Sequence, residues 1–599
     1  MRLPLFRTIY ILTFFCTFSA FAQNNASENI RLNQIGFYPE GPKKAVVVDS
    51  NAEEFSVLTA EEGKEVFSGK LGEAKKWPHS NEYVKQADFS SFQKSGNYIL
   101  KVHGVDESYA FEIAEKVHAE PAKASIKAFY FQRASTDLPA EYAGKWAREA
   151  GHSDAEVKIH NSAATEKRPA GSTISSPGGW YDAGDYGKYI VNSGITMGTL
   201  FSLYEDFPEY LDTLNLSIPE SSNNIPDFLD ETLYNLRWMM TMQDEDGGVY
   251  HKLTSADFQG SVLPKDATYQ RWVVQKSTTA TLDFSAVTAQ AARIFAGYEA
   301  ELPGLSDSLL VMSKKAYSWA KKNPEVEYIQ KELKEPAINT GAYGDSNVED
   351  EFQWAATELF VTTGDEKYYR EANLKNSAAA SFGVPSWPTV NTLALFSIAR
   401  NSDKYEESKV VDLDVIHKLI KNMADELVEY SQNSAYGTPM GASEKNFGWG
   451  SNSEAANQGV LLINAFKITR DQKYLDAAID NLDYLLGRNA TGFSFLTGFG
   501  EKSTRDPHHR PSEADKVEEP VPGFLAGGPN PGQQDKQNCG HLYTIEHQYP
   551  ATSYIDERCS YATNEIAINW NAPFVYLANA LEAIRINDIF PASYPDGEE

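Results

Sequence analysis

Two aspartates in a glycine-rich and aromatic-rich stretch are the residues of this chain best placed to do chemistry. Asp182 and Asp185 lie three residues apart within 178–187, among four glycines and three large aromatic side chains. Glycine lets the backbone take turns that other residues resist, so one loop can direct both carboxylates into the same space. The apolar run after Asp185 predicts a helix, whose free N-terminal amides would favour an ionised carboxylate. This pattern fits a general base, and also an Asx-rich turn that caps a helix.

A third carboxylate, near the C-terminus, has surroundings of the opposite kind. Glu565 is followed closely by Ile566, Ile568 and Trp570. A carboxyl group among apolar side chains has a raised pKa and keeps its proton near neutral pH, as a general acid must. Taken alone, Glu565 also fits a buried, paired carboxylate. One acid kept ionised and another kept protonated is the pairing that glycoside hydrolysis uses.

These stretches and two others together resemble glycoside hydrolase family 9, a cellulase family. The loop 178–187 and the tail 554–572 are similar to the two ends of the family's catalytic region. The stretch 277–287 resembles the entry to a central helix, and 497–500 with 507–511 resembles the substrate-binding loop. The resemblance implies an (α/α)6 barrel that hydrolyses β-1,4-glucosidic bonds with inversion, in cellulose-type glucan, mixed-linkage glucan or xyloglucan. Endo attack is expected because the candidates for aromatic stacking lie on well-separated parts of the chain.

The same resemblance implies a role for each acid. Asp185 corresponds to the base that takes a proton from water, Asp182 to the partner that holds this water, and Glu565 to the acid that protonates the leaving oxygen. An inverting enzyme keeps its acid and base far enough apart for a water to fit between base and sugar.

Sugar-binding residues are expected from the same motifs. His251, His509 and Arg510 are expected to hydrogen-bond sugar hydroxyls, with His508 open as the alternative to His509. An isolated tryptophan is more often part of a core than a stacking surface. The aromatic stacking candidates are Trp180, Tyr561, Trp449 and Trp272.

No cofactor is expected for the chemistry, but a structural calcium ion is implied by one stretch. Residues 346–351 resemble a family calcium site, in which Ser346, Asp350 and Glu351 would supply the hard oxygen ligands that calcium takes. A further family ligand, an aspartate after a later tryptophan, is missing because Pro388 follows Trp387. Acidic residues at a helix start are the alternative interpretation.

The elements that must position these residues fall into two regions. Short β-rich runs separated by turns predict a β-sandwich over 28–115, and its opening, 31–37, resembles the immunoglobulin-like module that precedes the barrel in many family members. We expect this module to brace the barrel, with carbohydrate binding as the alternative. From 120 to 590 the apolar spacing is helical, which by itself predicts one large, mainly α domain.

Composition and the N-terminus restrict partners and location. The chain has 599 residues and a net charge of −29, which disfavours nucleic acid and anionic membranes and suits a neutral glucan. Residues 1–22 have the basic start, short apolar core and small-residue end of a signal peptide, so we expect export, with cleavage after Ala22. No other stretch predicts a membrane span, and a monomer is expected.

Two cysteines would remain after that cleavage. Cys16 lies in the leader, and Cys539 and Cys559 form an even pair in an exported chain, which predicts a disulfide. Free thiols are the alternative.

Two classes of function stay open at this point. The three intact acids favour a hydrolase over a catalytically inactive glycan-binding protein. Within the enzymes, an exo-acting β-glucosidase, cellodextrinase or exo-β-glucosaminidase is the alternative to endo attack, because the proline- and glycine-rich stretch 516–540 could close one end of a cleft.

Overall fold

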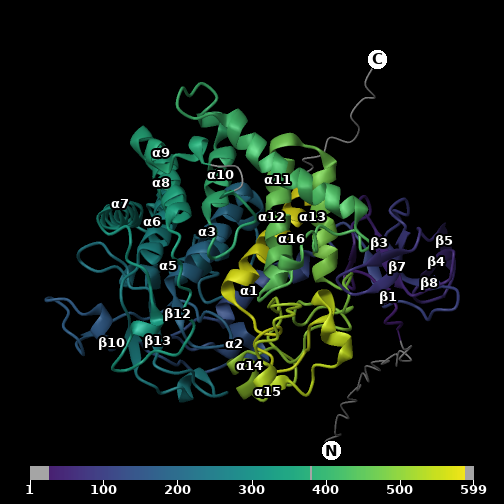
Figure 1. The fold of residues 1–599 in the computed structure, drawn as a ribbon, viewed down its shortest axis with the longest axis horizontal. Helices are drawn as coiled ribbons and strands as arrows, with labels where there is room; N and C mark the ends of the chain where they lie inside the picture. Colours follow the sequence, from purple (N-terminus) through teal and green to yellow (C-terminus); the bar gives the residue numbers. More distant parts are fainter. Residues whose placement is uncertain (1–25, 378–380, 587–599) are drawn as a thin grey trace, which may run out of the picture.

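The computed structural model describes residues 26–377 and 381–586. An N-terminal β-sandwich lies at one side of a larger helical body (Figure 1). The predicted signal peptide and the last residues of the range 120–590 lie outside the described part. Within the described part, no helix is both long and apolar enough to cross a membrane.

The sandwich consists of two sheets around one apolar core. Their inward-facing side chains, such as Val47, Val57 and Leu100, are fully buried. One sheet has the order β1 (Ile30–Arg31), β3 (Lys44–Val48), β7 (Glu82–Asp88), β6 (Lys75–Trp77). The other has the order β2 (Gly36–Phe37), β9 (Phe111–Ile113), β8 (Gly96–Val102), β4 (Glu54–Thr59), β5 (Glu65–Lys70).

The helical body is an (α/α)6 barrel, in which an inner ring of helices is surrounded by an outer one. The inner helices are buried almost all round, whereas outer helices such as α7 and α11 bury one stripe. The inner helices are α3 (Ile190–Asp206), α6 (Thr278–Phe295), α8 (Glu349–Thr363), α10 (Asn391–Arg400), α12 (Ser451–Thr469) and α16 (Ile568–Ile586). The outer helices are α1 (Ala119–Phe131), α5 (Asp227–Thr241), α7 (Leu305–Lys322), α9 (Glu366–Ala372), α11 (Leu413–Asn433) and α13 (Gln472–Leu485).

Local sequence signals set several of these helix ends. The Ser277 side chain caps α6 by accepting a hydrogen bond from the Ala280 amide, and Asp412 caps α11 in the same way. Helix α8 ends at Gly364, whose φ of 70° is the left-handed conformation that glycine adopts without strain.

A third sheet, which the sequence patterns did not reveal, lies within the helical body. Its order is β11 (Thr173–Ile174), β10 (Val157–Ile159), β14 (Arg271–Val273), β13 (Lys252–Ser255), β12 (Lys188–Tyr189). These strands have two to four residues each, too few for an alternating pattern to stand out. The short helices α2 (Ala140–Ala143), α4 (Pro208–Leu211), α14 (Arg510–Ala514) and α15 (Lys536–Cys539) complete the body.

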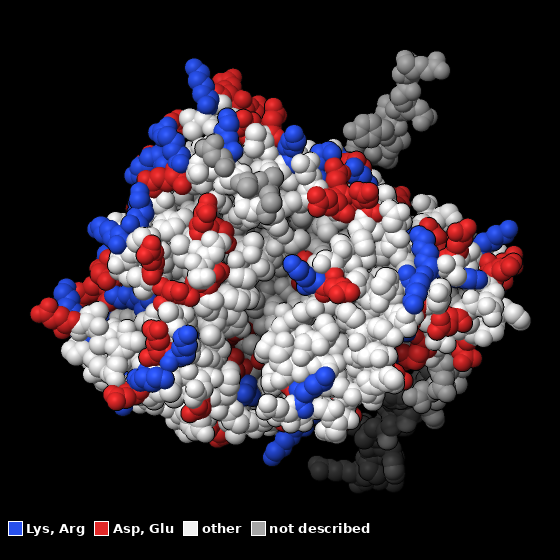
Figure 2. All heavy atoms as spheres, in the orientation of Figure 1, with Lys and Arg blue, Asp and Glu red and all other residues white. Residues whose placement is uncertain are grey.

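Polar contacts join the sandwich to the barrel. The Asn33 amide donates to Asp483 (2.8 Å), and the Tyr38 hydroxyl donates to Glu582 on α16 (2.8 Å). Lys44 pairs with Asp480 on α13 at 3.0 Å. Over the face seen in Figure 2, acidic and basic side chains are interspersed, and the surface is hollowed near its middle.

Candidate active site

The loop that carries Asp182 and Asp185 is held by side chains that donate to its backbone carbonyl oxygens. Three of these donors come from distant parts of the chain and one, Lys188, directly follows the loop, and together they restrict the conformational freedom that the glycines would allow. They are Gln132 to Ala183 (3.0 Å), Lys188 to Gly178 (2.8 Å), Arg271 to Tyr186 (2.6 Å) and Arg510 to Gly184 (2.8 Å).

A fully buried carboxylate joins two of these donors. Asp154 pairs with Lys188 at 2.7 Å and with Arg271 at 3.1 Å. Burial alone would raise the pKa of Asp154, but the two cations outweigh it and hold that pKa below its usual value. Asp154 therefore anchors the loop of the two aspartates through both cations.

Asp185 accepts hydrogen bonds from loop groups rather than from a helix. Its Oδ2 accepts from the Gly187 amide (2.9 Å) and from the Tyr189 hydroxyl (3.3 Å). Helix α3 does follow, as predicted, but it begins only at Ile190. The expected helix N-terminus is thus replaced by a loop amide and a phenol, which likewise favour the ionised carboxylate.

Asp182 lies deeper and receives three donor contacts. The Asn192 amide donates to both carboxylate oxygens (2.9 and 3.1 Å), and the Tyr343 hydroxyl donates to Oδ2 (3.0 Å). Burial and, next, the charge of Asp185 raise the pKa of Asp182 to about 8, although these donors oppose the shift. Asp182 therefore keeps its proton to a higher pH than a free carboxyl group does.

Glu565 lies in an extended segment that precedes α16, rather than on the helix itself. The segment pairs with His508, and the Gly527 amide donates to the Glu565 carbonyl (2.8 Å). Burial first, then the charge of Asp185, raises the pKa of Glu565 well above its usual value. The Gly184 backbone and the charge of Asp185 both act on the Glu565 carboxyl group, so the acid lies next to the loop of the two aspartates.

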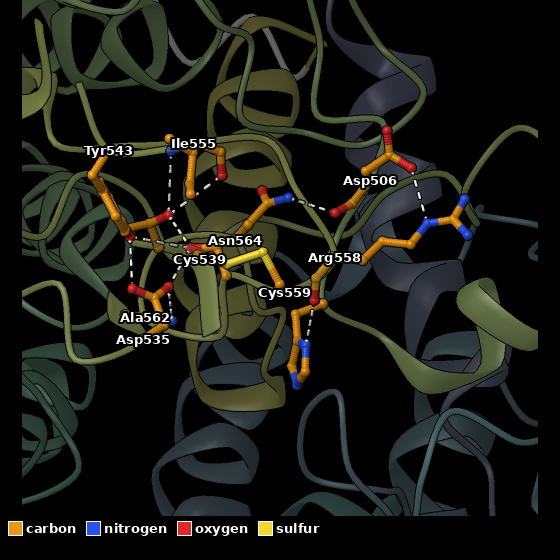
Figure 3. The surroundings of a disulfide bond; sticks show 12 residues. Asp506, Asp535, Cys539, Tyr543, Ile555, Arg558, Cys559, Ala562 and Asn564 are labelled. Carbon is orange, nitrogen blue, oxygen red and sulfur yellow. Dashed lines mark hydrogen bonds and ion pairs between the residues drawn. A yellow bond between two sulfur atoms is a disulfide. The ribbon is translucent and has the colours of Figure 1, made fainter. Parts of the chain in front are cut away.

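The segment before Glu565 is braced by a disulfide and by a network of polar contacts (Figure 3). Cys539 and Cys559 are bonded, with their Cα atoms 5.8 Å apart. Asp535 accepts from Tyr543 (2.9 Å) and from Ser560 (2.6 Å), and Asn564 donates to the Asp506 carbonyl (2.7 Å). The residues just before Glu565 are thus held both by the disulfide and by these hydrogen bonds.

Of the two neighbouring histidines, His508 and not His509 lies toward the catalytic carboxylates. His509 is fully buried, where it hydrogen-bonds Ser512 (2.9 Å) and Gln132 (3.1 Å), so it supports a loop-holding side chain instead of touching sugar. The His508 side chain is 19% exposed, and it lies close enough to Asp185 for the carboxylate charge to act on the His508 pKa. Consecutive residues in extended backbone point to opposite sides, which explains the one-residue error.

Two further residues expected to bind sugar are fully buried in this structure. His251 stacks on Tyr328 with 3.9 Å between ring centroids and hydrogen-bonds Ser277 and the Ala342 carbonyl. Trp180 donates to Glu231 (2.8 Å) and packs on Phe129. The contacts of both side chains lie within the fold, and their sugar contacts stay predictions.

The remaining aromatic candidates differ in access. Trp449 is 50% exposed, and its ring centroid lies 5.6 Å from that of Tyr561. Trp449 also lines a cavity of about 200 Å³ together with Trp387 and Trp570. Trp272, half-buried on β14, lies beneath the Lys158 ammonium, 5.6 Å away. Trp449 and Tyr561 therefore offer the accessible aromatic surface.

The stretch expected to bind calcium has the right chemistry but not a complete ligand set. Asp350 already accepts from Asn347 (2.7 Å) and from the Val390 amide (2.9 Å). Glu351 and Asp283 are buried, and their four carboxyl oxygens have no hydrogen-bond partner in the described structure. Among the described residues, however, no three His, Cys, Asp or Glu side chains are arranged to hold a metal ion. The side chains present therefore do not form a calcium site by themselves.

Two residues at the site were not found by sequence reasoning. Tyr343 donates to Asp182, and Lys252 is buried beside both aspartates. Lys252 directly follows His251 and could have been considered with it, whereas nothing in the sequence near Tyr343 indicates its distant partner.

Comparison with known proteins agrees with this geometry. The family model described as glycosyl hydrolase family 9 matches residues 118–578, and that of the cellulase N-terminal ig-like domain matches residues 25–107. A xyloglucan-specific endo-β-1,4-glucanase of Bacteroides ovatus, BoGH9A, is 46% identical over 94% of this chain and 95% of its own length.

Other relatives point the same way. Endoglucanase D of Acetivibrio thermocellus is 35% identical over 91% of this chain and 82% of its own length. A solved structure titled Bacteroides ovatus GH9 superposes with a TM-score of 0.86 at 45% identity, covering 93% of this chain and 99% of that one. The chain thus belongs to glycosyl hydrolase family 9.

Proposed function

We propose that this protein is an inverting endo-β-1,4-glucanase in which Asp185 is the base and Glu565 the acid. The observation that carries the proposal is the contrast between these two groups at one site. Asp185 receives donors that stabilise its charge, while burial favours the protonated form of Glu565. A pair of carboxyl groups with opposite protonation states is what acid–base hydrolysis of a glycoside requires.

The reaction follows from these protonation states. Asp185 takes a proton from a water as the water oxygen bonds to the anomeric carbon. Glu565 gives its proton to the glycosidic oxygen as the bond between that oxygen and the anomeric carbon breaks. Asp182, fixed by Asn192 and Tyr343, orients the water. Arg510 lies close enough to Glu565 to act on its charge, and His508 lies beside it on the neighbouring segment.

Endo attack is supported by the accessible aromatic surface. An internal sugar unit needs a platform open at both ends, and half of the Trp449 surface is exposed beside Tyr561. The endoglucanase relatives agree with this mode. Because the Bacteroides ovatus relative is named as xyloglucan-specific, we propose xyloglucan as the preferred β-1,4-glucan.

The test compares viscosity with reducing ends on xyloglucan, mixed-linkage glucan and carboxymethyl-cellulose. We expect the viscosity of xyloglucan to fall well before reducing ends accumulate, with slower action on the unbranched glucans. Release of a monosaccharide while viscosity holds would establish the exo alternative. If the protein binds these glucans but releases no product from xyloglucan, mixed-linkage glucan or carboxymethyl-cellulose, it is a glycan-binding protein.

A matched pair of variants tests the platform. Trp449→Ala should raise KM for the polymer more than it lowers kcat, by up to about tenfold, because a stacking contact contributes about 0.5–1.5 kcal/mol. The control Tyr83→Ala removes an exposed aromatic ring on β7 of the sandwich, outside the site. Equal KM effects from both would remove Trp449 from its special role.

We also propose calcium binding near Glu351 and export of the mature chain. Calcium would need Ser346 and the carboxyl groups of Asp350 and Glu351 to reorganise, and Asp283 is close enough to join them. Thermal unfolding with calcium and with chelator tests the first proposal, and no change in melting temperature would contradict it. N-terminal sequencing of exported protein tests cleavage after Ala22.

A further inference from the structure

Lys252 is a buried lysine without a carboxylate partner at ion-pair distance in the described structure. Its side chain is fully buried, and its Nζ donates to Gln330 Oε1 (2.7 Å), Thr340 Oγ1 (3.0 Å) and the Gly341 carbonyl. Three acceptors match the three N–H donors of an ammonium group. Burial lowers the pKa of Lys252 to about 7, so the side chain carries its charge at acidic pH. The other buried lysine of this sheet, Lys188, is instead neutralised by Asp154.

The sheet places this ammonium beside the catalytic loop. Lys252 on β13 pairs directly with Tyr189 on β12, and cross-strand partners share one face of a sheet. The Lys252 Nζ lies 5.3 Å from the Tyr189 ring centroid, and the Tyr189 hydroxyl contacts Asp185 Oδ2. The charges of Asp185 and then Asp182 oppose the lowering of the Lys252 pKa, so this lysine lies within the electrostatic reach of both acids.

The same ammonium also fixes the loop that carries Tyr343. Gly341, whose carbonyl accepts from Lys252, lies so close to Tyr189 that a Cβ atom there would be 3.1 Å from the tyrosine hydroxyl. Two residues later, Tyr343 donates to Asp182. Lys252 thus touches neither aspartate, yet it contacts the segments that hold both.

We propose that Lys252 is a positioning residue whose positive charge keeps the Asp182–Asp185 pair ionised enough for base catalysis. The inference rests on the proposed function, because it assigns a role to the same pair. Burying an ammonium group costs free energy, and a neutral side chain at this position would avoid that cost. A buried lysine here therefore indicates that its charge has a function. A nearby positive charge favours the ionised form of a carboxyl group.

Other titratable groups face this cluster and must be separated from Lys252. Tyr189, Tyr328 and Tyr343 surround it, with pKa values that burial raises above the usual range for tyrosine. Glu565 faces it across the site, and burial lowers the pKa of the neighbouring His251 to about 3, so that ring is neutral. Two basic side chains also face the carboxylates, Arg510 near Glu565 and His508 near Asp185, and both are unchanged in the Lys252 variants.

The test is the pH profile of kcat/KM on a soluble β-glucan for Lys252→Met. Removing the charge should shift the acid limb upward by about one pH unit or more, because a charge at this range shifts a carboxyl pKa by about 1–3 units. The variant should then lose about tenfold or more at low pH and recover much of that loss at higher pH. Lys252→Arg, which keeps the charge, should retain the native acid limb even where its geometry lowers kcat.

Two further measurements keep the test decisive. Lys276→Met removes another lysine, one that pairs with Asp244 and Asp246 away from the aspartate loop, and should leave the acid limb unchanged. Circular dichroism confirms folding, and Lys252→Gln replaces the methionine variant if the latter does not fold. A wild-type protein without glucanase activity contradicts the proposed function. An active wild type whose acid limb is unmoved in Lys252→Met or Lys252→Gln contradicts the inference alone.

Discussion

The two sides of this active site hold carboxyl groups by opposite means. On the base side, Gln132, Lys188, Arg271 and Arg510 donate to loop carbonyls, and donors also reach Asp185 itself. On the acid side, Glu565 lies in a segment fixed by backbone pairing and preceded by a disulfide. In the proposed mechanism, hydrogen-bond donors in one place and burial in the other give the same functional group two protonation states.

The largest loss is expected on the base side. Asp185→Ala should lower kcat by about 10²–10⁴-fold on every substrate, because water activation is required whatever the leaving group. Azide should partly restore turnover by replacing the activated water. Near-native activity in this variant, measured with the polymer and with an aryl glycoside, would transfer the base role to Asp182.

The acid side should respond selectively. Glu565→Gln should lose about 10²–10⁴-fold on polymer but far less on an aryl glycoside, whose leaving group needs little protonation. Because the raised pKa of Glu565 sets when the acid loses its proton, the native alkaline limb should disappear on the aryl glycoside. Equal losses on both substrates would remove Glu565 from the acid role.

The ion pairs of Asp154, which hold the loop of the proposed base, should contribute more to the free energy of unfolding than the disulfide near Glu565 does. Asp154→Asn leaves two buried cations without a partner and should lower the free energy of unfolding by about 3–5 kcal/mol. Asn tolerates the positive φ of 46° at this position, so backbone strain does not confuse the result. Denaturation in urea measures the difference.

The sign of the pH dependence is fixed by the lowered pKa of Asp154 in the folded state. Its contribution to stability is present above the unfolded pKa of about 3.9 and is lost as the pH falls through the folded value. The difference between native protein and Asp154→Asn should therefore shrink at low pH. Glu366→Gln, in an exposed pair with Arg370, is the control and should change stability by less than about 0.5 kcal/mol.

The acid side offers a smaller structural effect. Replacing both Cys539 and Cys559 by serine should cost about 3 kcal/mol, since the bond closes a loop with a sequence separation of 20 residues. We expect kcat at low temperature to change little, because the Asp506 and Asp535 contacts remain. Thermal unfolding of native and variant protein tests this, and an unchanged melting temperature would show that the bond does not stabilise the fold.

Much of the site could be predicted because its chemistry lies in short contiguous motifs. Asp182, Asp185 and Glu565 could be proposed because the residues next to them in the sequence indicate the surroundings of each carboxyl group. The burial of His251 and His509 could not be predicted, because the side of an extended segment that faces the site depends on contacts with distant segments. In both places the adjacent residue, Lys252 or His508, is the one that faces the carboxylates.

The helical barrel followed from apolar spacing and from the family resemblance, whereas its short third sheet did not. Strands of two to four residues carry too little pattern, yet β12 and β13 position Tyr189 and Lys252. The role of Tyr343 could not be predicted either, because its hydrogen-bond partner Asp182 lies far away in the sequence. Contacts between distant segments are what a single sequence does not display.

The stereochemistry of the first product tests the central claim most directly. If Asp185 activates water on one face while Glu565 protonates the oxygen on the other, a β-linked glucan must release the α-anomer first. Proton NMR of the anomeric signals during the first minutes of hydrolysis distinguishes the two anomers before they equilibrate. Initial α-anomer is the result that the account predicts, and initial β-anomer would mean retention and would contradict it.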